Sequence, residues 1–179
     1  MEGKEGRARD RYSDLVALYS ERIFNLALRM LRNRENAEEA TQDVFVKVFK
    51  SMENFRGESS LSTWIWKITM NVCFSYLRKK KINSVNLEDA GIDPPDEQTG
   101  NFSNQENMLY HDELSITINK YISMLPANES AAITLFYLEG MSYEEISEIL
   151  KAPIGTISIA LHRGRKRLRE MLKKKKEEI

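Results

Sequence analysis

The sequence predicts an all-α protein built from two small helical modules, and three observations support this expectation. Apolar residues recur at every third or fourth position over most of the chain, and no stretch shows the two-residue alternation of a strand. This periodicity stops over residues 82–104, where prolines and glycines are concentrated. We therefore expect a module over 1–81, a flexible acidic linker over 82–104, and a module over 105–179 that contains a helix-turn-helix.

Composition narrows the class of protein. Of the 179 residues, 41% are hydrophobic and 30% are charged, which is typical of a soluble globular chain. The first residues lack the apolar core of a secretory signal, and no stretch approaches the ~18 apolar residues of a membrane span. One cysteine (Cys73) excludes an intrachain disulfide, and with two histidines a zinc site would need carboxylates. We expect a cytoplasmic protein with no membrane insertion, no metal and no cofactor.

The formal net charge of zero conceals an uneven distribution. Residues 1–81 carry 16 basic and 11 acidic side chains, residues 82–127 carry one and eight, and residues 128–179 carry ten and eight. The ends are therefore basic and the middle is acidic, a pattern that indicates binding of a polyanion by the ends. Solvated helix faces are the alternative explanation of the same charges.

Three helices are expected in the first module, at about 10–31, 35–52 and 60–80. Gly57 and the serines that follow it mark the start of the third helix. Apolar spacing predicts the residues that each helix buries. For the first helix these are Leu15, Leu18, Tyr19, Ile23, Leu26, Ala27 and Met30. For the second they are Ala37, Ala40, Thr41, Val44 and Val48, and for the third they are Ile65, Ile68, Val72 and Tyr76.

Four further helices are expected in the second module, with prolines and a glycine between them. They cover about 107–124, 128–138, 142–151 and 155–174. Ser142 can cap the third of these while Glu145 bonds back to the cap amide. A short capped helix, a tight break and a longer helix then follow one another, which is the order of a helix-turn-helix.

The last helix has an apolar side and a basic side. Ile157, Leu161, Gly164 and Leu168 repeat at helical spacing and form the side that faces the core. The opposite side and its flanks carry Ser158, Ile159, His162, Arg163, Arg165, Lys166, Arg169 and Lys173. Such a helix can enter a DNA major groove, where cations neutralise phosphates and polar side chains read base edges. A basic amphipathic helix on a membrane surface is the alternative.

The third helix carries aromatic and cationic residues on the side away from its apolar stripe. One continuous face contains Trp64, Lys67, Asn71, Phe74 and Arg78. This face suits a single nucleic-acid strand, because bases stack on the rings while the cations follow the backbone. Packing of the two rings against the rest of the protein is the alternative.

The second helix presents a face of mixed polarity. It comprises Glu39, Gln42, Asp43, Val46 and Lys50. A face of this kind is either exposed to solvent or used to dock a large protein, and periodicity does not separate the two uses.

Two blocks of the sequence are characteristic in their order and in the acidic spacer between them. The first is AEEATQDVFVKVFKSMENFRGESSLSTWIWKITMNVCFSYLRKKK, and the second is LPANESAAITLFYLEGMSYEEISEILKAPIGTISIALHRGRKRLREML. Together they resemble a bacterial RNA polymerase sigma factor of the extracytoplasmic function (ECF) group. The resemblance covers most of the chain outside the N-terminal tail and the linker. It departs from the usual pattern over 155–160, where GTISIA replaces GTVKSR, and at Glu39, where aspartate is usual.

The resemblance implies a role for each surface. It implies that the clamp of core RNA polymerase binds Glu39, Gln42, Asp43 and Val46. It implies that the minus-ten element, once melted, contacts Phe55, Arg56, Ser59, Trp64, Lys67, Asn71, Phe74, Arg78, Lys79 and Lys80, with a flipped base held by the loop over 55–59. It implies that the minus-thirty-five element contacts Thr156, Ser158, Ile159, His162, Arg163, Arg165 and Lys166. The family also implies an anti-sigma factor as a partner, and trapping of an unstacked base as the means of melting.

Two other functions are weighed against a sigma factor. A conventional helix-turn-helix repressor or activator would bind duplex DNA tightly without polymerase. An enzyme, such as a helical nuclease, would need a nucleophile set, paired carboxylates on one face or a phosphate-binding loop, and the sequence contains none of these motifs. The combined pattern predicts a sigma factor that binds core polymerase and promoter DNA and is not an enzyme.

Overall fold

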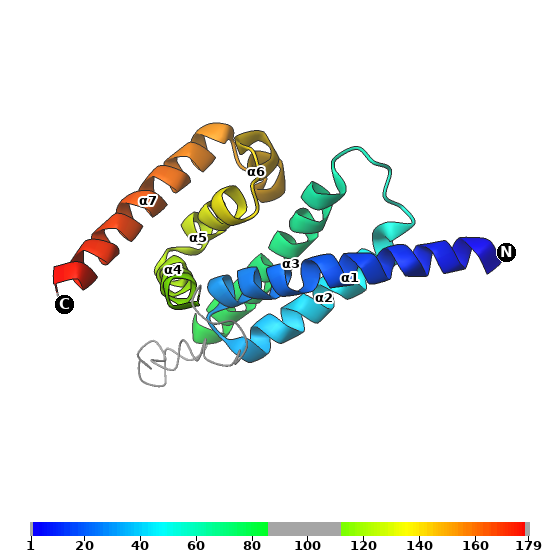
Figure 1. Ribbon diagram of the computed structural model, residues 1–179, viewed down its shortest axis with the longest axis horizontal. Coiled ribbons are helices and arrows are strands. Elements are labelled where there is room, and N and C mark those ends of the chain that lie inside the picture. Colours follow the sequence, from blue (N-terminus) through cyan, green and yellow to red (C-terminus); the bar gives the residue numbers. More distant parts are fainter. Residues whose placement is uncertain (1, 86–111, 178–179) are drawn as a thin grey trace. The chain divides into compact units, whose positions relative to one another are not determined.

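The chain consists of two helical units. The computed structural model describes residues 2–85 and 112–177, and within these ranges every regular element is helical (Figure 1). The units comprise Met1–Leu77 and Arg78–Ile179. The expected all-α fold is therefore confirmed for the described residues, and residues 86–104 of the expected linker lie outside them.

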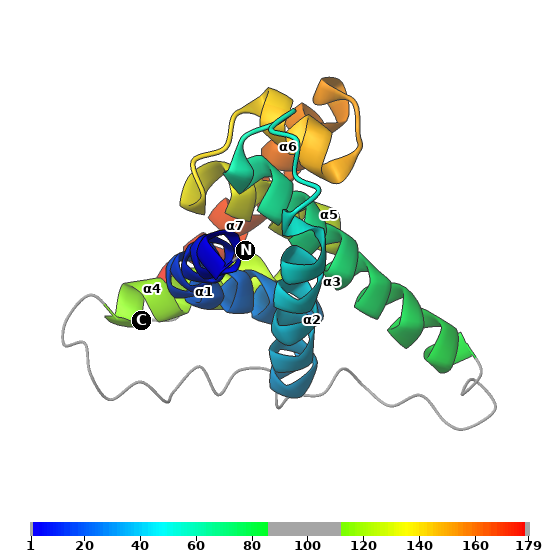
Figure 2. The ribbon, with the colours of Figure 1, turned by 90° about the vertical axis from the view of Figure 1, so that its right-hand side faces the viewer.

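Helices α1 (Glu2–Leu31) and α2 (Arg34–Met52) pack side by side in the first unit (Figures 1 and 2). Two residues connect them. Arg32 adopts a left-handed conformation with a φ of 53°, and the Asn33 side chain accepts a hydrogen bond from the Asn36 amide at 2.8 Å. A left-handed residue ends one helix and an N-cap begins the next, so the chain reverses within a short turn.

Helix α3 (Leu61–Val85) begins close to the predicted residue and continues beyond the expected start of the linker. In the loop before it, Gly57 takes a left-handed φ of 71°, which favours glycine. Ser60 Oγ accepts a hydrogen bond from the Thr63 amide at 3.0 Å, as an N-cap does. The serine cluster therefore starts this helix as the sequence indicated.

The buried side of α3 is wider than predicted. Trp66 is fully buried, and its ring meets Tyr19 of α1 edge to face with centroids 6.2 Å apart. Cys73 is also buried, which raises the pKa of its thiol to about 12. Ile68 and Tyr76, both expected in the core, are only half-buried. Because α3 contacts both α1 and α2, its buried arc spans more than one stripe.

The predicted stripes of α1 and α2 are largely buried, with one error. Leu18 is exposed, whereas the other predicted residues of α1 are buried. It lies about 100° around the helix from Tyr19, at the margin of the arc that packs against α2. On α2, four predicted residues are buried and Thr41 is half-buried, with its hydroxyl donating to the Ala37 carbonyl at 2.7 Å.

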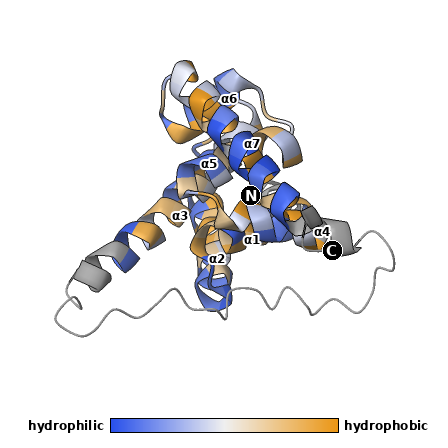
Figure 3. Ribbon diagram, turned by 90° about the vertical axis from the view of Figure 1, so that its left-hand side faces the viewer, coloured by the Kyte–Doolittle hydropathy of each residue, from blue (hydrophilic) through white to orange (hydrophobic). Residues whose placement is uncertain are grey.

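Five helical elements occupy the described residues 112–177 of the second unit. They are α4 (Asp112–Met124), α5 (Ala127–Ile133), the π-helical turn η1 (Thr134–Leu138), α6 (Tyr143–Leu150) and α7 (Ile154–Glu177). α5 and η1 together occupy the range expected for one helix, and residues 107–111 of the first expected helix lie outside the described residues. Figure 3 shows hydrophobic and hydrophilic residues alternating along α5, α6 and α7, as in amphipathic helices.

The core of the second unit lies where α5, α6 and α7 meet. Ile146 of α6 and Ile157 and Leu161 of α7 are buried there. Gly164 faces α5 so closely that a Cβ added to it would lie 2.8 Å from Cγ1 of Ile133. The two helices can approach this closely because position 164 has no side chain.

Candidate nucleic-acid interface

Helix α6, a short turn and α7 form the helix-turn-helix. The predicted capping box is present: the Glu145 amide donates to Ser142 Oγ at 3.2 Å, and the Ser142 amide donates to Glu145 Oε2 at 2.9 Å. Lys151 ends α6 in a left-handed conformation with a φ of 52°. The Ser147 hydroxyl donates to the Ala152 carbonyl at 2.6 Å and so ties the turn to α6. These bonds set the direction in which α7 leaves the turn.

Six of the seven residues predicted to contact the minus-thirty-five element share the exposed outer side of α7. They are Thr156, Ser158, Ile159, His162, Arg163 and Lys166. On the opposite side, Ile157 and Leu161 are buried and hold the helix to its unit. The outer side therefore combines hydroxyls, an imidazole and two cations with one exposed aliphatic side chain. A helix presented in this way can be inserted into a major groove.

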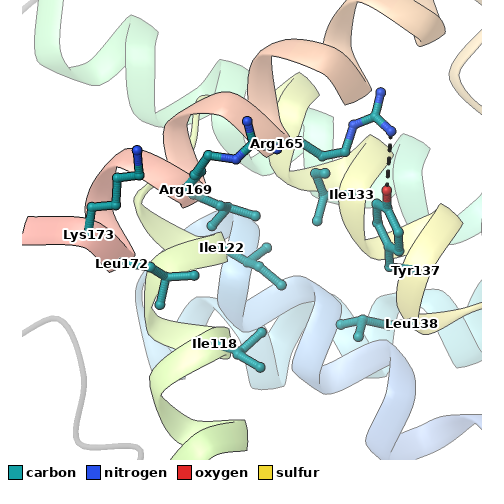
Figure 4. A pocket seen from close by; sticks show the side chains of 10 residues that line it. Ile118, Ile122, Ile133, Tyr137, Leu138, Arg165, Arg169, Leu172 and Lys173 are labelled. Atoms are coloured by element: carbon teal, nitrogen blue, oxygen red, sulfur yellow. Dashed lines mark hydrogen bonds between the residues drawn. The ribbon is translucent and has the colours of Figure 1, made fainter. Parts of the chain in front are cut away.

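The seventh predicted residue, Arg165, is also exposed and lies on the same flank of α7 as Ser158, but its side chain contacts another helical element. Its guanidinium donates to the Tyr137 hydroxyl at 3.5 Å, and its side chain borders a largely apolar groove of about 710 Å³ in the second unit (Figure 4). The next arginine, Arg167, places Nε 3.1 Å from Oε2 of the buried Glu129 on α5. The sequence shows only that α7 is rich in basic residues. It does not show which of them contact other side chains of the protein, as Arg165 and Arg167 do.

The loop before α3 brings two of the predicted minus-ten residues together. The rings of Phe55 and Trp64 are 5.0 Å apart between centroids, with planes inclined at 43°. Both are half-buried, while Arg56 beside them is exposed and Ser59 is half-buried. Trp64 therefore packs partly on Phe55 and keeps part of its surface exposed, so the packing alternative is correct in part and the contact with a DNA strand stays a prediction.

The remaining predicted residues of this surface follow α3 towards its end. Lys67 and Phe74 are half-buried, and Asn71 between them is exposed. Three exposed cations follow at the end of α3: Arg78 continues this face, and Lys79 and Lys80 lie further around the helix. The surface thus runs from an aromatic pair to a cationic end, which offers stacking to bases and charge to phosphates.

The predicted docking face lies on α2. Glu39, Gln42, Asp43 and Val46 are all exposed. The Tyr76 hydroxyl of α3 donates to Oδ2 of Asp43 at 3.0 Å. Burial, and then the hydrogen bond to Asp43 and the charge of that carboxylate, raise the pKa of Tyr76 to about 12. The neutral phenol therefore holds the Asp43 carboxylate in one orientation.

Two residues of this face were not predicted from the sequence. Tyr76 was assigned to the core because it continues the apolar spacing of α3. Phe49 is 59% exposed, lies one turn after Val46 on α2, and meets Tyr12 of α1 edge to face with centroids 5.1 Å apart. The spacing of three residues between Val46 and Phe49 was the available signal for an apolar extension of the face.

Residues 2–85 and 112–177 contain neither a candidate metal centre nor a candidate membrane span. In these ranges, no group of three histidine, cysteine, aspartate or glutamate side chains is arranged to hold a metal ion. None of the helices described there is both long enough and apolar enough to cross a bilayer.

Both units match known sequence families. Residues 15–82 match the family model of Sigma-70 region 2, and residues 116–168 match that of Sigma-70, region 4. The first match covers α2 and most of α1 and α3, and the second covers the helix-turn-helix.

Relatives of known function match along most of the chain. The ECF RNA polymerase sigma factor SigW of Bacillus subtilis is 32% identical over 168 residues, which are 92% of this chain and 90% of that protein. The RNA polymerase sigma-H factor of Pseudomonas aeruginosa is 30% identical, over 88% of this chain and 84% of that protein. The ECF RNA polymerase sigma-E factor of Escherichia coli is 30% identical, over 84% of this chain and 81% of that protein.

Two solved structures share the fold. The sigma factor RpoE from Bartonella quintana, determined with the anti-sigma factor NepR, has a TM-score of 0.71 at 24% identity and covers 91% of this chain and 97% of that chain. CnrH, determined with the cytosolic domain of CnrY, has a TM-score of 0.61 at 16% identity and covers 92% of this chain and 89% of that chain. At these identities the similarity concerns the fold.

Proposed function

Since the chain belongs to the extracytoplasmic function (ECF) group of RNA polymerase sigma factors, we propose how its surfaces divide the steps of transcription initiation. As a sigma factor, the protein binds core RNA polymerase and directs promoter recognition and initiation. Residues 1–81 dock on the polymerase and open the minus-ten element. Residues 105–179 bind the minus-thirty-five element, and residues 82–104 link the two modules.

The pairing of Phe55 with Trp64 is the observation that carries the proposal for DNA opening. Extruding a base costs a few kcal/mol in lost pairing and stacking. Stacking on an aromatic side chain returns about 1–3 kcal/mol per base, so one or two captured bases offset that cost. The two half-exposed rings lie next to the exposed cation of Arg56, which can hold the adjoining phosphate.

Cations at the end of α3 extend this surface along the DNA. Arg78, Lys79 and Lys80 are exposed there, beyond the half-buried Phe74. Phosphate contacts carry no sequence information but set the position of the protein on the duplex. In the proposal they hold the upstream duplex, so that the bases leaving it meet Asn71, Lys67 and the aromatic pair.

The outer side of α7 binds the major groove of the minus-thirty-five element. Arg163 and Lys166 are exposed on it and neutralise phosphates, while Thr156 and Ser158 place hydroxyls near the start of the helix. Arg165 contributes less than its charge suggests, because it is directed towards Tyr137.

The polymerase binds the exposed face of α2. This face carries acidic and amide groups at the predicted positions. Exposed Phe49 adds an apolar surface next to Val46, of the kind found in protein interfaces. Asp43 is held by Tyr76, which lowers the loss of side-chain freedom on binding.

The protein acts in the cytoplasm and has no catalytic role of its own, since the chemistry of RNA synthesis belongs to the polymerase. An anti-sigma factor is a further partner. The complexes of RpoE with NepR and of CnrH with CnrY support this assignment by analogy of fold.

Reconstitution tests the proposal. The purified protein is mixed with core RNA polymerase, and the complex is used for run-off transcription from a library of candidate promoters. We expect a stable complex and transcripts from templates that share two elements at a constant separation. A protein that fails to bind the core enzyme, yet binds a duplex site with nanomolar affinity, would support the repressor or activator alternative.

A further inference from the structure

An exposed isoleucine lies at the centre of the surface assigned to the minus-thirty-five element. Ile159 is 53% exposed and lies about 200° around α7 from the buried Ile157, so it points away from the core. His162 and Lys166 lie near it on the same side of the helix and are also exposed. A β-branched aliphatic side chain among polar and cationic residues contributes nothing to the core of its unit.

The residues that precede Ile159 on the outer side of α7 are small, so the Ile159 side chain projects beyond them. Gly155 lies one turn before it on the same side, and a Cβ built on Gly155 would meet no atom of the protein within 4 Å. Thr156 and Ser158 are small and exposed. Ile159 is therefore the largest side chain on the outer side of the first turns of α7, which are the turns that approach base edges when such a helix enters a groove.

The chemistry of isoleucine selects one feature of the DNA. In the major groove, adenine, guanine and cytosine present hydrogen-bond donors and acceptors, whereas thymine adds a methyl group at C5. An aliphatic side chain placed over a donor or acceptor removes water from it without replacing the hydrogen bond, which is unfavourable. Placed over the thymine methyl group, the same side chain buries apolar surface on both partners.

We propose that Ile159 is a specificity residue that contacts the C5 methyl group of a thymine in the minus-thirty-five element. The inference rests on the proposed insertion of α7 into that element. It adds the DNA group that Ile159 contacts. It assigns a thymine preference to one or two adjacent base pairs. Arg163 and Lys166, which contact phosphates in the proposal, hold the helix in place without sharing this preference.

Removal of a single DNA methyl group tests the contact. Holoenzyme containing the full-length protein is first used with a randomised minus-thirty-five element to find the positions at which thymine is preferred. Each such thymine is then replaced by deoxyuridine, which lacks only the methyl group, and promoter affinity is measured by competition. We expect the wild-type holoenzyme to lose about fourfold in affinity at one position, equivalent to about 0.8 kcal/mol for one buried carbon.

The protein variants make the test specific to Ile159. Ile159→Ala should bind the thymine and deoxyuridine promoters equally, and Ile159→Val should keep most of the difference. Ile154→Ala is the matched control, because Ile154 is on the same helix, is 47% exposed and lies about 140° away from Ile159. It should retain the wild-type fourfold difference.

Two results would overturn the inference. One is a wild-type holoenzyme that is insensitive to deoxyuridine at every preferred thymine. The other is an Ile159→Ala holoenzyme that loses as much affinity as wild type on the same substitution. Failure of the proposed function looks different, because the holoenzyme would then select no minus-thirty-five sequence from the library at all.

Discussion

Trp64 and Trp66 lie two positions apart on α3 and have different surroundings. Trp66 is fully buried against Tyr19, whereas Trp64 is half-buried beside Phe55. Side chains two residues apart on a helix point in directions about 200° apart, which explains the contrast. Trp66 therefore belongs to the core, whereas Trp64 keeps part of its ring exposed for the role in DNA binding that we propose.

Replacement of the two tryptophans should separate stability from promoter opening. Trp66→Ala should lower the free energy of unfolding by about 3–5 kcal/mol, as large core truncations do. Trp64→Ala should cost only about 0.5–1.5 kcal/mol of stability from its contact with Phe55. It should, however, weaken promoter opening by about 1–3 kcal/mol. Urea unfolding and transcription from a duplex promoter measure the two effects.

A template with a pre-melted minus-ten element provides the control for Trp64. The transcription defect of Trp64→Ala should become smaller on this template, because part of the cost of opening has been removed. Normal transcription from the duplex promoter by a stably folded Trp64→Ala protein would contradict the assignment of this ring to the DNA strand.

The ionisation of Tyr76 reports its burial and its contacts with the carboxylates of Asp43 and Glu39. Its pKa is raised to about 12, so the folded protein holds the phenol proton more tightly than the unfolded chain, where the pKa is near 10. The stabilisation by the neutral phenol is therefore complete below pH 10 and is lost as the pH rises through 10 towards 12. Tyrosinate formation is followed by ultraviolet absorbance in the wild type and in Tyr76→Phe. The difference between the two titration curves should correspond to one group that ionises near pH 12. A difference curve centred near 10 would mean that Tyr76 is neither buried nor in contact with the carboxylates of Asp43 and Glu39.

Residue positions could be predicted from the sequence where a helix has one clear core side. The outer residues of α7, including Ile159 and His162, are exposed as expected because Ile157 and Leu161 define the opposite side. The partners of individual polar residues could not be predicted. Arg165 meets the Tyr137 hydroxyl across a separation of 28 residues, and no local pattern encodes such a contact.

Close packing of α5 and α7 depends on Gly164. An added Cβ would lie 2.8 Å from Cγ1 of Ile133, a side chain that is itself buried and cannot move away freely. Gly155 on the same helix has no atom within 4 Å of the corresponding position. The two glycines therefore have opposite roles in α7 although both interrupt a helical sequence.

Alanine at each glycine should change stability in opposite directions. Gly164→Ala gains about 1 kcal/mol of helix propensity but loses about 1–3 kcal/mol to overpacking, so a net loss of up to about 2 kcal/mol is expected. Gly155→Ala gains propensity without a clash and should stabilise the unit by up to about 1 kcal/mol. Urea unfolding of the full chain measures both. An equal gain in the two variants would show that α5 and α7 are not in close contact.

Neighbouring cations on α7 should differ in function. Lys166 lies on the outer side, whereas Arg167 forms an ion pair with the buried Glu129. Lys166→Ala should weaken holoenzyme binding to all promoters alike and reduce the slope of log affinity against log salt by about one. Arg167→Ala should leave that slope unchanged and lower stability instead, because Glu129 keeps a buried charge without its partner. The orientation of α7 would be wrong if Arg167→Ala reduced the salt slope and Lys166→Ala lowered stability instead.

Helices were predicted well where their ends carry local signals. The capping box of Ser142 and Glu145 and the serines before α3 both occur at predicted starts. The π-helical turn η1 was not predicted, because its sequence continues the apolar spacing of α5 and the difference in hydrogen bonding leaves no trace in that spacing. The width of the buried side of α3 also depends on packing against two helices, which periodicity within one helix does not contain.

At the scale of the whole molecule, promoter binding in the proposal is divided between two surfaces. The aromatic and cationic face of α3 lies on a different helix, and in a different sequence module, from the outer side of α7. In the proposal each surface neutralises few phosphates, so electrostatic attraction contributes little affinity to either one, and salt lowers that affinity further. We therefore expect the free protein to bind duplex DNA weakly at physiological salt and the polymerase to supply the remaining affinity.

The most direct test of this account measures promoter opening with the two partners apart and together. A fluorescent adenine analogue in the minus-ten element reports unstacking of the base when it leaves the duplex. We predict that its fluorescence rises when core polymerase and this protein are both present, and that neither raises it alone. Nanomolar, sequence-specific binding of the promoter by the free protein, with no increase in fluorescence when core polymerase is added, would contradict the account.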